Sequence, residues 1–270
     1  MVTRILHVSD LHVGARDDPL VESGLAALVT RIAPDLVVAS GDLTHRGRPE
    51  QHERAARLLR SLGPPVLAVP GNHDIPFAPP GRVGRPWREF ERQWETTEPV
   101  HEDDGLVVVG LNSVRPWHHQ SGGLTTTQLA RSEERLRAAA PGALRMVVLH
   151  HQLVGAPWRT RKRALAHRGQ VLERLAAAGG ELIAGGHVHQ GAVAERREFA
   201  VTEAGATIVT TAPGLGQPRP HRLGEARGAL AYRWDASSIS VETYVWLGGD
   251  WTLTALRTFA RGRGPLTPTA

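Results

Sequence analysis

The chain has 270 residues, of which 41% are hydrophobic and 22% charged, so it is long enough and apolar enough to fold around one sizeable core. It contains no cysteine, which excludes disulfides and thiolate ligands and indicates a reducing, cytoplasmic location. No stretch approaches the roughly 20 apolar residues of a transmembrane helix. The first residues lead directly into a predicted strand, which is not the pattern of a signal peptide.

The formal net charge of +5 comes almost entirely from arginine, because Lys162 is the only lysine. A basic protein can bind nucleic acid, but here the positive charges are dispersed along the chain rather than gathered in one stripe. We therefore attribute the arginine excess to a GC-rich coding bias, and nucleic acid is not favoured as a partner.

Short apolar runs alternate with helical stretches up to about residue 186, which predicts a fold rich in βαβ units. The first predicted helix ends at Pro34 and carries apolar residues at helical spacing, namely Val21, Leu25, Leu28, Val29 and Ile32. The second ends at Gly63-Pro64-Pro65 and carries Ala55, Leu58, Leu59 and Leu62. Such apolar faces are expected to cover a sheet.

The middle of the chain continues with loops and helices around clear strands. A long loop over residues 75–86 is expected before a short helix at about 86–94, and residues 106–111 read as a strand. Thr126 or Thr127 is expected to cap a helix that runs to about Ala139. A further helix carries Val171, Leu172 and Leu175 and leads to Gly179-Gly180.

The last third of the chain reads as consecutive strands that form an antiparallel region. These strands are expected near residues 192–201, 206–211, 228–234, 238–247 and 251–259. We predict a single domain over residues 1–260, with the motifs described below in 1–190, a β-rich part in 191–260 and a flexible tail at 261–270. Two sheets face to face with helices outside are expected, and an edge of the β-rich part could support a homodimer.

Polar side chains follow five short apolar runs, at the points where strands would end. The runs are Ile5–Val8, Leu36–Ala39, Val66–Val69, Met146–Leu149 and Leu182–Ala184. The motifs that follow them are Asp10-Leu11-His12, Gly41-Asp42, Gly71-Asn72-His73-Asp74, His150-His151 and Gly186-His187-Val188-His189. Because the carboxyl ends of strands gather ligand loops in α/β folds, these carboxylate, carboxamide and imidazole groups predict a metal site.

The spacing within the motifs suits metal binding. Residues two apart in an extended segment point the same way, so Asp10 and His12 could bind one ion, as could His187 and His189. Together the motifs supply two Asp, one Asn and four His, which are too many for one tetrahedral ion and suit two ions that share a carboxylate. Taken singly, each motif is more readily explained as a turn cap or a packed histidine.

In this order the motifs resemble those of the calcineurin-like metallophosphoesterases, whose pattern D-x-H, G-D, G-N-H-[DE], H and G-H-x-H is complete within residues 10–189. The resemblance implies a four-layer αββα sandwich of two mixed β-sheets. It also implies two divalent metal ions, for which Mn, Fe, Zn, Ni and Mg are all compatible with N and O ligands. The implied assignment places Asp10, His12 and His189 on one ion, Asn72, His150 and His187 on the other, and Asp42 on both.

The activity implied by this resemblance is hydrolysis of a phosphoester through in-line attack by a metal-bridging hydroxide. His73 is implied as a catalytic residue that stabilises the transition state or protonates the leaving oxygen. Asp74 is also a catalytic candidate, since it either orients His73 or closes the turn.

The second motif narrows the expected substrate. His45 stands where the Ser/Thr protein phosphatases carry an acid, and Gly-Asp-Leu-Thr is more similar to the bacterial class III cyclic nucleotide phosphodiesterases. A small phosphoester such as a 3′,5′-cyclic nucleotide is therefore favoured. A pyrophosphatase for a lipid precursor of the UDP-diacylglucosamine type, a nuclease similar to the double-strand-break repair nucleases and a catalytically silent scaffold are the alternatives.

The loops over residues 76–86, 114–124 and 155–168 are expected to set the substrate. Within and beside them, contacts to substrate are predicted for Asn112, His118, His119, Arg159 and Arg161. Solvated loop histidines and a solvated basic turn over residues 159–163 are the plainer explanations. His151 follows a predicted ligand and is expected to face away from the metals.

Overall fold

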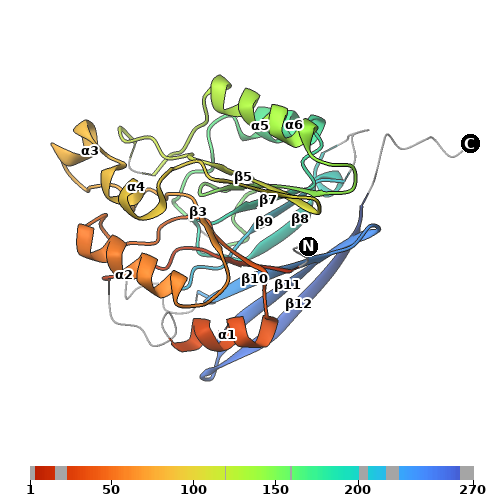
Figure 1. The fold of residues 1–270 in the computed structure, drawn as a ribbon, viewed down its shortest axis with the longest axis horizontal. Coiled ribbons are helices and arrows are strands. Elements are labelled where there is room, and N and C mark those ends of the chain that lie inside the picture. The colour runs from red at the N-terminus through yellow and green to blue at the C-terminus, as the bar shows by residue number, and fades with distance from the viewer. Residues whose placement is uncertain are drawn as a thin grey trace, which may run out of the picture.

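The computed structural model describes residues 4–15, 23–118, 120–158, 160–200, 206–216 and 225–261. Two six-stranded mixed sheets face each other, with helices on the outer face of each sheet (Figure 1). This arrangement is the αββα sandwich expected from the sequence. Within the described ranges, no helix is both long enough and apolar enough to cross a membrane.

The first sheet has the strand order β12-β11-β10-β1-β2-β3. Its parallel half consists of β1 (Arg4–Val8), β2 (Leu36–Ala39) and β3 (Val66–Ala68). Its antiparallel half consists of β10 (Gly228–Trp234), β11 (Ser238–Leu247) and β12 (Asp250–Ala260). The chain therefore returns to its first strand from the C-terminal third.

The second sheet has the strand order β4-β5-β6-β7-β9-β8. Its four central strands are parallel, and they are β5 (Leu106–Leu111), β6 (Leu144–Leu149), β7 (Leu182–Gly185) and β9 (Ile208–Thr211). The two edges are antiparallel to their neighbours and are formed by β4 (Val100–Asp103) and β8 (Ala192–Glu195).

Helices cover the outside of both sheets. The first sheet carries α1 (Leu25–Ile32) and α2 (Pro49–Arg60), and the second carries α5 (Thr126–Ala138) and α6 (Arg168–Ala177). The connection from β3 to β4 contains α3 (Gly81–Gly84) and α4 (Arg88–Trp94), and a 3₁₀ turn spans Arg196–Glu198. In Figure 1, α5 and α6 lie above the sheets, and α1 lies below them.

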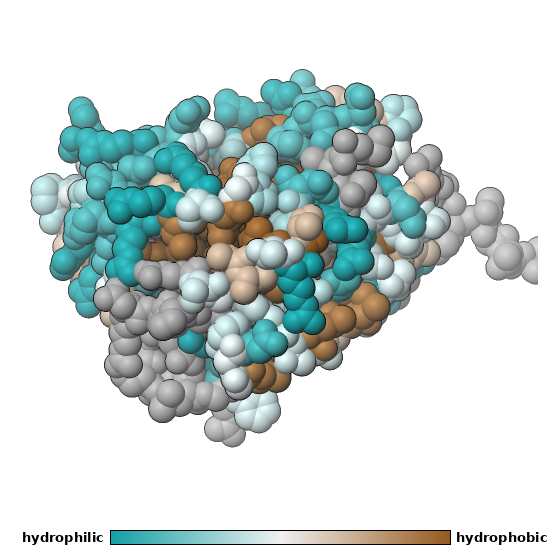
Figure 2. Space-filling model, turned by 60° about the horizontal axis from the view of Figure 1, so that its bottom comes forward, coloured by the Kyte–Doolittle hydropathy of each residue, from teal (hydrophilic) through white to brown (hydrophobic). Residues whose placement is uncertain are grey.

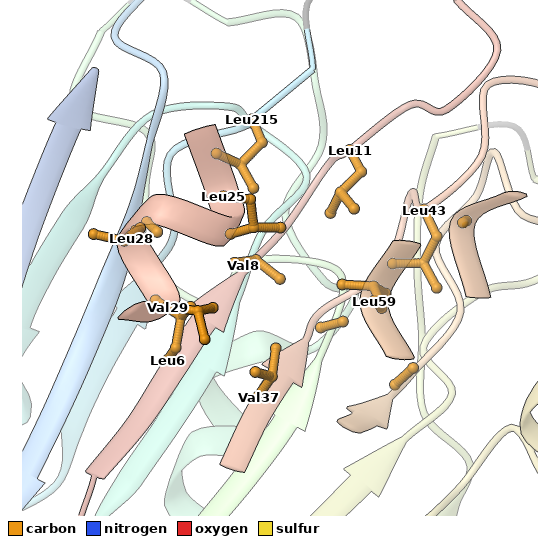
Figure 3. Packing of buried hydrophobic residues seen from close by; sticks show 14 of the residues in the cluster. Leu6, Val8, Leu11, Leu25, Leu28, Val29, Val37, Leu43, Leu59 and Leu215 are labelled. Atoms are coloured by element: carbon orange, nitrogen blue, oxygen red, sulfur yellow. The ribbon is translucent and has the colours of Figure 1, made fainter. Parts of the chain in front are cut away.

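Successive side chains along a strand point to opposite faces of the sheet, so the buried apolar residues form three layers. In β1, Ile5 belongs to the layer between the two sheets, whereas Leu6 packs outward against α1. Figure 3 shows this outer layer, in which Leu25, Leu28 and Leu59 of α1 and α2 meet the strand residues. A third layer lies between the second sheet and α5 and α6. Hydrophilic side chains dominate the face shown in Figure 2, where they surround smaller apolar areas.

The predicted antiparallel C-terminal region is wrong in part. Strands β8 and β9 belong to the second sheet, and β9 runs parallel to β7, whereas only β10 to β12 form a continuous antiparallel unit. The predicted strand over residues 192–201 stops at Glu195, where a 3₁₀ turn begins. Local sequence pattern identifies an extended segment, but its partner depends on long-range packing.

Smaller corrections concern caps and loops. Thr125, rather than Thr126 or Thr127, caps α5. Its hydroxyl accepts a hydrogen bond from the Gln128 backbone N–H, and the Gln128 side-chain oxygen accepts one from the Thr125 backbone N–H, which forms a capping box. The loop predicted over residues 75–86 contains the single turn α3. Residue Val21 and the predicted tail beyond Arg261 lie outside the described residues.

Candidate dinuclear metal centre

The carboxyl ends of five strands from both sheets converge on one buried site. The seven residues predicted as ligands all lie there, none more than 8% exposed, and they are Asp10 and His12 after β1, Asp42 after β2, Asn72 after β3, His150 after β6, and His187 and His189 after β7. Strands of two different sheets contribute, so the site forms only when the sandwich is assembled.

Asp10, His12 and His189 form the first group. The Oδ1 atom of Asp10 lies 3.1 Å from Nε2 of His189 and 3.8 Å from Nε2 of His12. The two imidazole Nε2 atoms lie 3.1 Å apart. Three atoms with lone pairs thus surround one point, which is the arrangement that a divalent ion requires.

Asp42, His150 and His187 form the second group, and Asn72 joins it. The Nε2 atom of His150 lies 3.4 Å from Oδ1 of Asp42, 3.2 Å from Nδ1 of His187 and 3.3 Å from Oδ1 of Asn72. This group therefore combines carboxylate, carboxamide and imidazole atoms.

Asp42 stands between the two groups. Its Oδ1 faces His150, and its Oδ2 lies 3.8 Å from Nε2 of His12 in the first group. One carboxylate that presents a different oxygen to each group is the geometry of a shared ligand.

Buried oxygen atoms at the centre indicate that the residues fit a pair of cations. Oδ1 of Asp10 and Oδ2 of Asp42 are buried and have no hydrogen-bond partner among the described residues. An unpaired buried carboxylate oxygen is strongly disfavoured, and a cation would satisfy it. The Nδ1 atom of His150 lies 2.8 Å from the Ser40 carbonyl oxygen, which only accepts, so Nδ1 carries a proton and Nε2 faces the centre.

The electrostatics of the centre follow from burial and mutual attraction. Burial alone would raise the pKa of Asp10 and of Asp42, but His189 and His150 hold both well below the usual range. Burial lowers the pKa of His150, yet Asp42 outweighs it and raises this pKa to about 9. The carboxylates thus stay ionised, and a metal ion would displace the proton that His150 otherwise holds.

Most of the ligand candidates have an unusual backbone conformation. Positive φ angles occur at Asp10 (54°), His12 (49°), Asp42 (51°), His187 (74°) and His189 (61°). The expectation that Asp10 and His12 project from an extended segment is therefore wrong, although their side chains still meet. Left-handed backbone at residues other than glycine is unfavourable and tends to concentrate at functional sites.

His73 lies at the rim of the centre and is half-buried. Its backbone N–H donates to Oδ1 of Asp42 (2.8 Å), and its Nδ1 lies 2.7 Å from the carbonyl oxygen of His45. Because that carbonyl only accepts, Nδ1 carries the proton and Nε2 remains for a ligand. The ring meets that of His12 edge-on, at 4.8 Å between centroids.

Asp74 contacts backbone rather than the imidazole of His73 in the described hydrogen bonds. Its carboxylate accepts from the N–H groups of Gly71 (2.8 Å), Leu43 (3.1 Å) and Thr44 (2.8 Å), and from the Thr44 hydroxyl (2.9 Å). It thereby ties the loop after β3 to the loop after β2. These contacts fit the turn-closing alternative better than direct orientation of His73.

The other residues predicted to contact the substrate do not gather in one place. Asn112 is buried, and its side-chain oxygen accepts from the Val114 backbone at 3.0 Å, which closes a turn. His118 and Arg161 are exposed on loops. His119 and Arg159 lie outside the described residues.

Two residues near the centre were not among the site residues predicted from the sequence. The Lys162 ammonium donates to the carbonyl oxygen of His187, and its positive charge lowers the pKa of Asp10. His151 is buried, with Nδ1 2.8 Å from the Ser113 hydroxyl and its ring 4.6 Å from that of His187. The sequence signal for Lys162 was its place in the basic turn over residues 159–163, where it is the only lysine of the chain.

The sandwich and its two buried groups of Asp and His, joined by Asp42, define a metallophosphoesterase with a metal centre of the dinuclear type. The chain belongs to the calcineurin-like phosphoesterase family, whose model matches residues 3–191. This match confirms the family expected from the five sequence motifs.

Comparisons with individual proteins agree with this family. A probable cyclic nucleotide phosphodiesterase of Synechococcus is 31% identical over 161 residues, which cover 56% of this chain and 58% of the relative. The glycerophosphodiester phosphodiesterase GpdQ of Enterobacter lignolyticus is 38% identical over 80 residues, which cover 26% of this chain and 29% of the relative. The matches thus span 58% or less of the length of these relatives.

A solved structure matches over nearly the whole chain. The dimetal phosphatase of Danio rerio superposes with a TM-score of 0.67 at 14% sequence identity and covers 97% of this chain and 99% of that protein. At this identity the likeness concerns the fold.

Proposed function

We propose that the protein is a dinuclear metal-dependent phosphodiesterase. The observation that carries this proposal is the position of Asp42, whose two carboxylate oxygens face two separate groups of buried ligands. Asp10, His12 and His189 would hold one ion, and Asn72, His150 and His187 the other, with Asp42 shared.

Each part of the centre has a distinct role in this proposal. Two divalent ions, when bound, supply Lewis acidity toward phosphate oxygens and lower the pKa of water. Ser9 and the His187 backbone N–H donate to Oδ2 of Asp10 (2.7 and 2.9 Å), so Oδ1 is held toward the imidazoles. His73, fixed through Nδ1, presents Nε2 to a substrate, and in the imidazolium form the proton on Nε2 would stabilise developing charge or pass to the leaving oxygen.

The relatives support a class of substrate. The two curated relatives described above are a probable cyclic nucleotide phosphodiesterase and a glycerophosphodiester phosphodiesterase, so both names refer to phosphodiesters. In addition, His45 stands where the Ser/Thr protein phosphatases carry an acidic residue. Both observations support a small diester, such as a 3′,5′-cyclic nucleotide, as the substrate.

The first test combines metal content with turnover. Manganese-loaded protein is expected to hold two ions per chain by elemental analysis and to hydrolyse bis(p-nitrophenyl) phosphate. Asp42→Asn removes the negative charge that both ions share and should lower the metal content with little change in shape. His73→Ala should keep both ions but reduce kcat by about 10²- to 10⁴-fold.

The outcomes separate an enzyme from a scaffold of the same fold. If the wild-type protein binds two ions yet turns over no faster than His73→Ala, the catalytic proposal is wrong. A panel of cyclic nucleotides, dinucleotides, nucleotide diphosphate lipids and single-stranded DNA, tested on one metal-loaded preparation, then identifies the preferred ester.

A further inference from the structure

A groove of about 390 Å³ lies beside the loop that carries His45. Its lining includes Arg46 and Arg48 of that loop, Pro76 and Phe77 of the loop after β3, and Glu89 of α4. A volume of this size falls within the range of small-molecule sites. The proposed chemistry does not use this groove.

The groove is built by the same two loops that position His73. The His45 carbonyl oxygen receives the hydrogen bond from Nδ1 of His73, and Arg46 follows directly. The two loops are in close contact at Gly47, where an added Cβ would lie 2.6 Å from the Ile75 carbonyl oxygen. The groove and the imidazole that we expect to face the substrate are therefore held by the same pair of loops.

Phe77 presents an aromatic ring in this groove. Its side chain is 64% exposed, although the guanidinium carbon of Arg46 lies 5.6 Å from the ring centroid. The loop that carries it is anchored by Arg82, which is buried and donates through Nε to the Pro116 carbonyl (2.7 Å) and through Nη1 to the Pro76 carbonyl (3.1 Å). The exposed ring thus stands on a fixed support, as a binding surface requires.

The charges around the groove favour an anion. Glu89 is already paired with Arg92 (3.1 Å) and Arg88 (3.6 Å) on its own helix. Arg48 and Glu50 are 3.9 Å apart and both largely exposed, so this pair neutralises little. Arg46 and Arg48 therefore give the groove a net positive charge.

We propose that this groove binds the flat ring of a nucleotide-type phosphodiester, with the ring stacked on Phe77 and the negative charge attracted by Arg46. This inference rests on the proposed function and specifies the substrate group next to the scissile phosphate. A heterocyclic ring can stack favourably on both the phenyl face and the guanidinium plane, whereas an alkyl chain has little attraction to the guanidinium. The groove would then distinguish nucleotides from glycerol-based diesters.

Binding of two simple anions tests the groove without requiring turnover. Adenosine 5′-monophosphate and ribose 5-phosphate share a phosphate and a sugar, and only the first has a ring system to stack. By calorimetry on the metal-loaded protein, the first is expected to bind about tenfold more tightly. Phe77→Leu should remove this preference, and Phe77→Trp should retain it.

A kinetic comparison extends the test to substrates. Phe77→Leu and Arg46→Gln should each lower the ratio of kcat/KM for 3′,5′-cyclic AMP to that for glycerophosphoethanolamine by about tenfold. Arg60→Gln is the matched control, because Arg60 lies 5.3 Å from the ring of Trp94 at the other end of α2 and should leave the ratio unchanged.

The groove proposal and the catalytic proposal can fail separately. If the wild type binds both anions equally, or if Phe77→Leu keeps the preference for the adenosine compound, the groove does not bind the ring. If neither diester is hydrolysed, the proposed function is wrong, and the binding comparison still decides the role of Phe77.

Discussion

At the scale of single residues, Asp74 shows how one buried carboxyl group holds two loops of the centre. Burial raises its pKa, as does the nearby charge of Asp42, yet three backbone N–H groups and one hydroxyl donate to it. The surrounding groups are all donors, so the site requires an acceptor. We therefore regard Asp74 as a positioning residue.

Asp74→Asn is expected to lower the free energy of unfolding by about 1 to 3 kcal/mol, because the new amide group places a donor among donors. Urea denaturation with a chelator present measures this without a contribution from metal. Thr44→Ser keeps the hydroxyl that donates to Asp74 and should have a smaller effect. Equal stability of wild type and Asp74→Asn would show that these hydrogen bonds do not hold the loops.

Sequence predicted the identity of the site residues better than their conformation. Asp10 and His12 were recognised from their motif, but their φ angles of 54° and 49° contradict the extended backbone from which their convergence was inferred. Left-handed conformations at Asp and His depend on contacts from other strands, such as the bond from the Asp10 N–H to the Gly41 carbonyl (2.9 Å). Spacing along the chain contains no information on these contacts.

At the scale of elements, the loops after β2 and β3 touch at Gly71. A Cβ added there would lie 2.2 Å from the Asp42 backbone nitrogen and 2.3 Å from its Oδ1. Gly71→Ala must therefore displace the carboxylate that faces both ligand groups. We expect less bound metal by elemental analysis, and a free energy of unfolding lower by about 1 to 3 kcal/mol.

Gly169→Ala in α6 is the matched control for this substitution. A Cβ at Gly169 meets nothing within 4 Å, and alanine favours a helix over glycine by about 0.5 to 1 kcal/mol. This variant should bind metal normally and be slightly more stable. Normal metal content in Gly71→Ala would show that the two loops can separate without loss of the centre.

The predictability of an element depended on whether its signal is local. Strand β5 was located correctly because all six residues are apolar and buried between layers. Strand β4 was missed, since Val-His-Glu-Asp at a sheet edge is only partly buried and has no apolar run. Strand β9 was found, but its parallel pairing with β7 was not, because partner choice is settled by the packing of the two sheets.

At the scale of the whole molecule, a buried polar network crosses between the two sheets. The Tyr232 hydroxyl of β10 lies 2.7 Å from Nδ1 of His7 in β1 and 2.7 Å from the Thr210 hydroxyl of β9. Nε2 of His7 lies 2.8 Å from the Ser40 hydroxyl. His7 itself is fully buried.

This network makes stability depend on pH through His7. Burial lowers the pKa of His7 to about 3, against the opposing charge of Asp10, so the folded protein holds this ring neutral. In the unfolded chain the ring takes up a proton below about pH 6.5. The neutral His7 ring therefore contributes its full share of the free energy of unfolding above that pH, and this share is lost progressively as pH falls from about 6.5 toward 3.

His7→Gln retains a donor and an acceptor but cannot titrate. Between pH 7.5 and 4.5 the wild type should lose about 3 kcal/mol more of its unfolding free energy than this variant, because two pH units below 6.5 are involved. Urea denaturation of both proteins in chelator, over this pH range, measures the difference, in which the contributions of the other histidines cancel. If the two proteins lose stability in parallel, His7 takes up its proton equally in the folded and unfolded states, and the network between the sheets tolerates a charged ring.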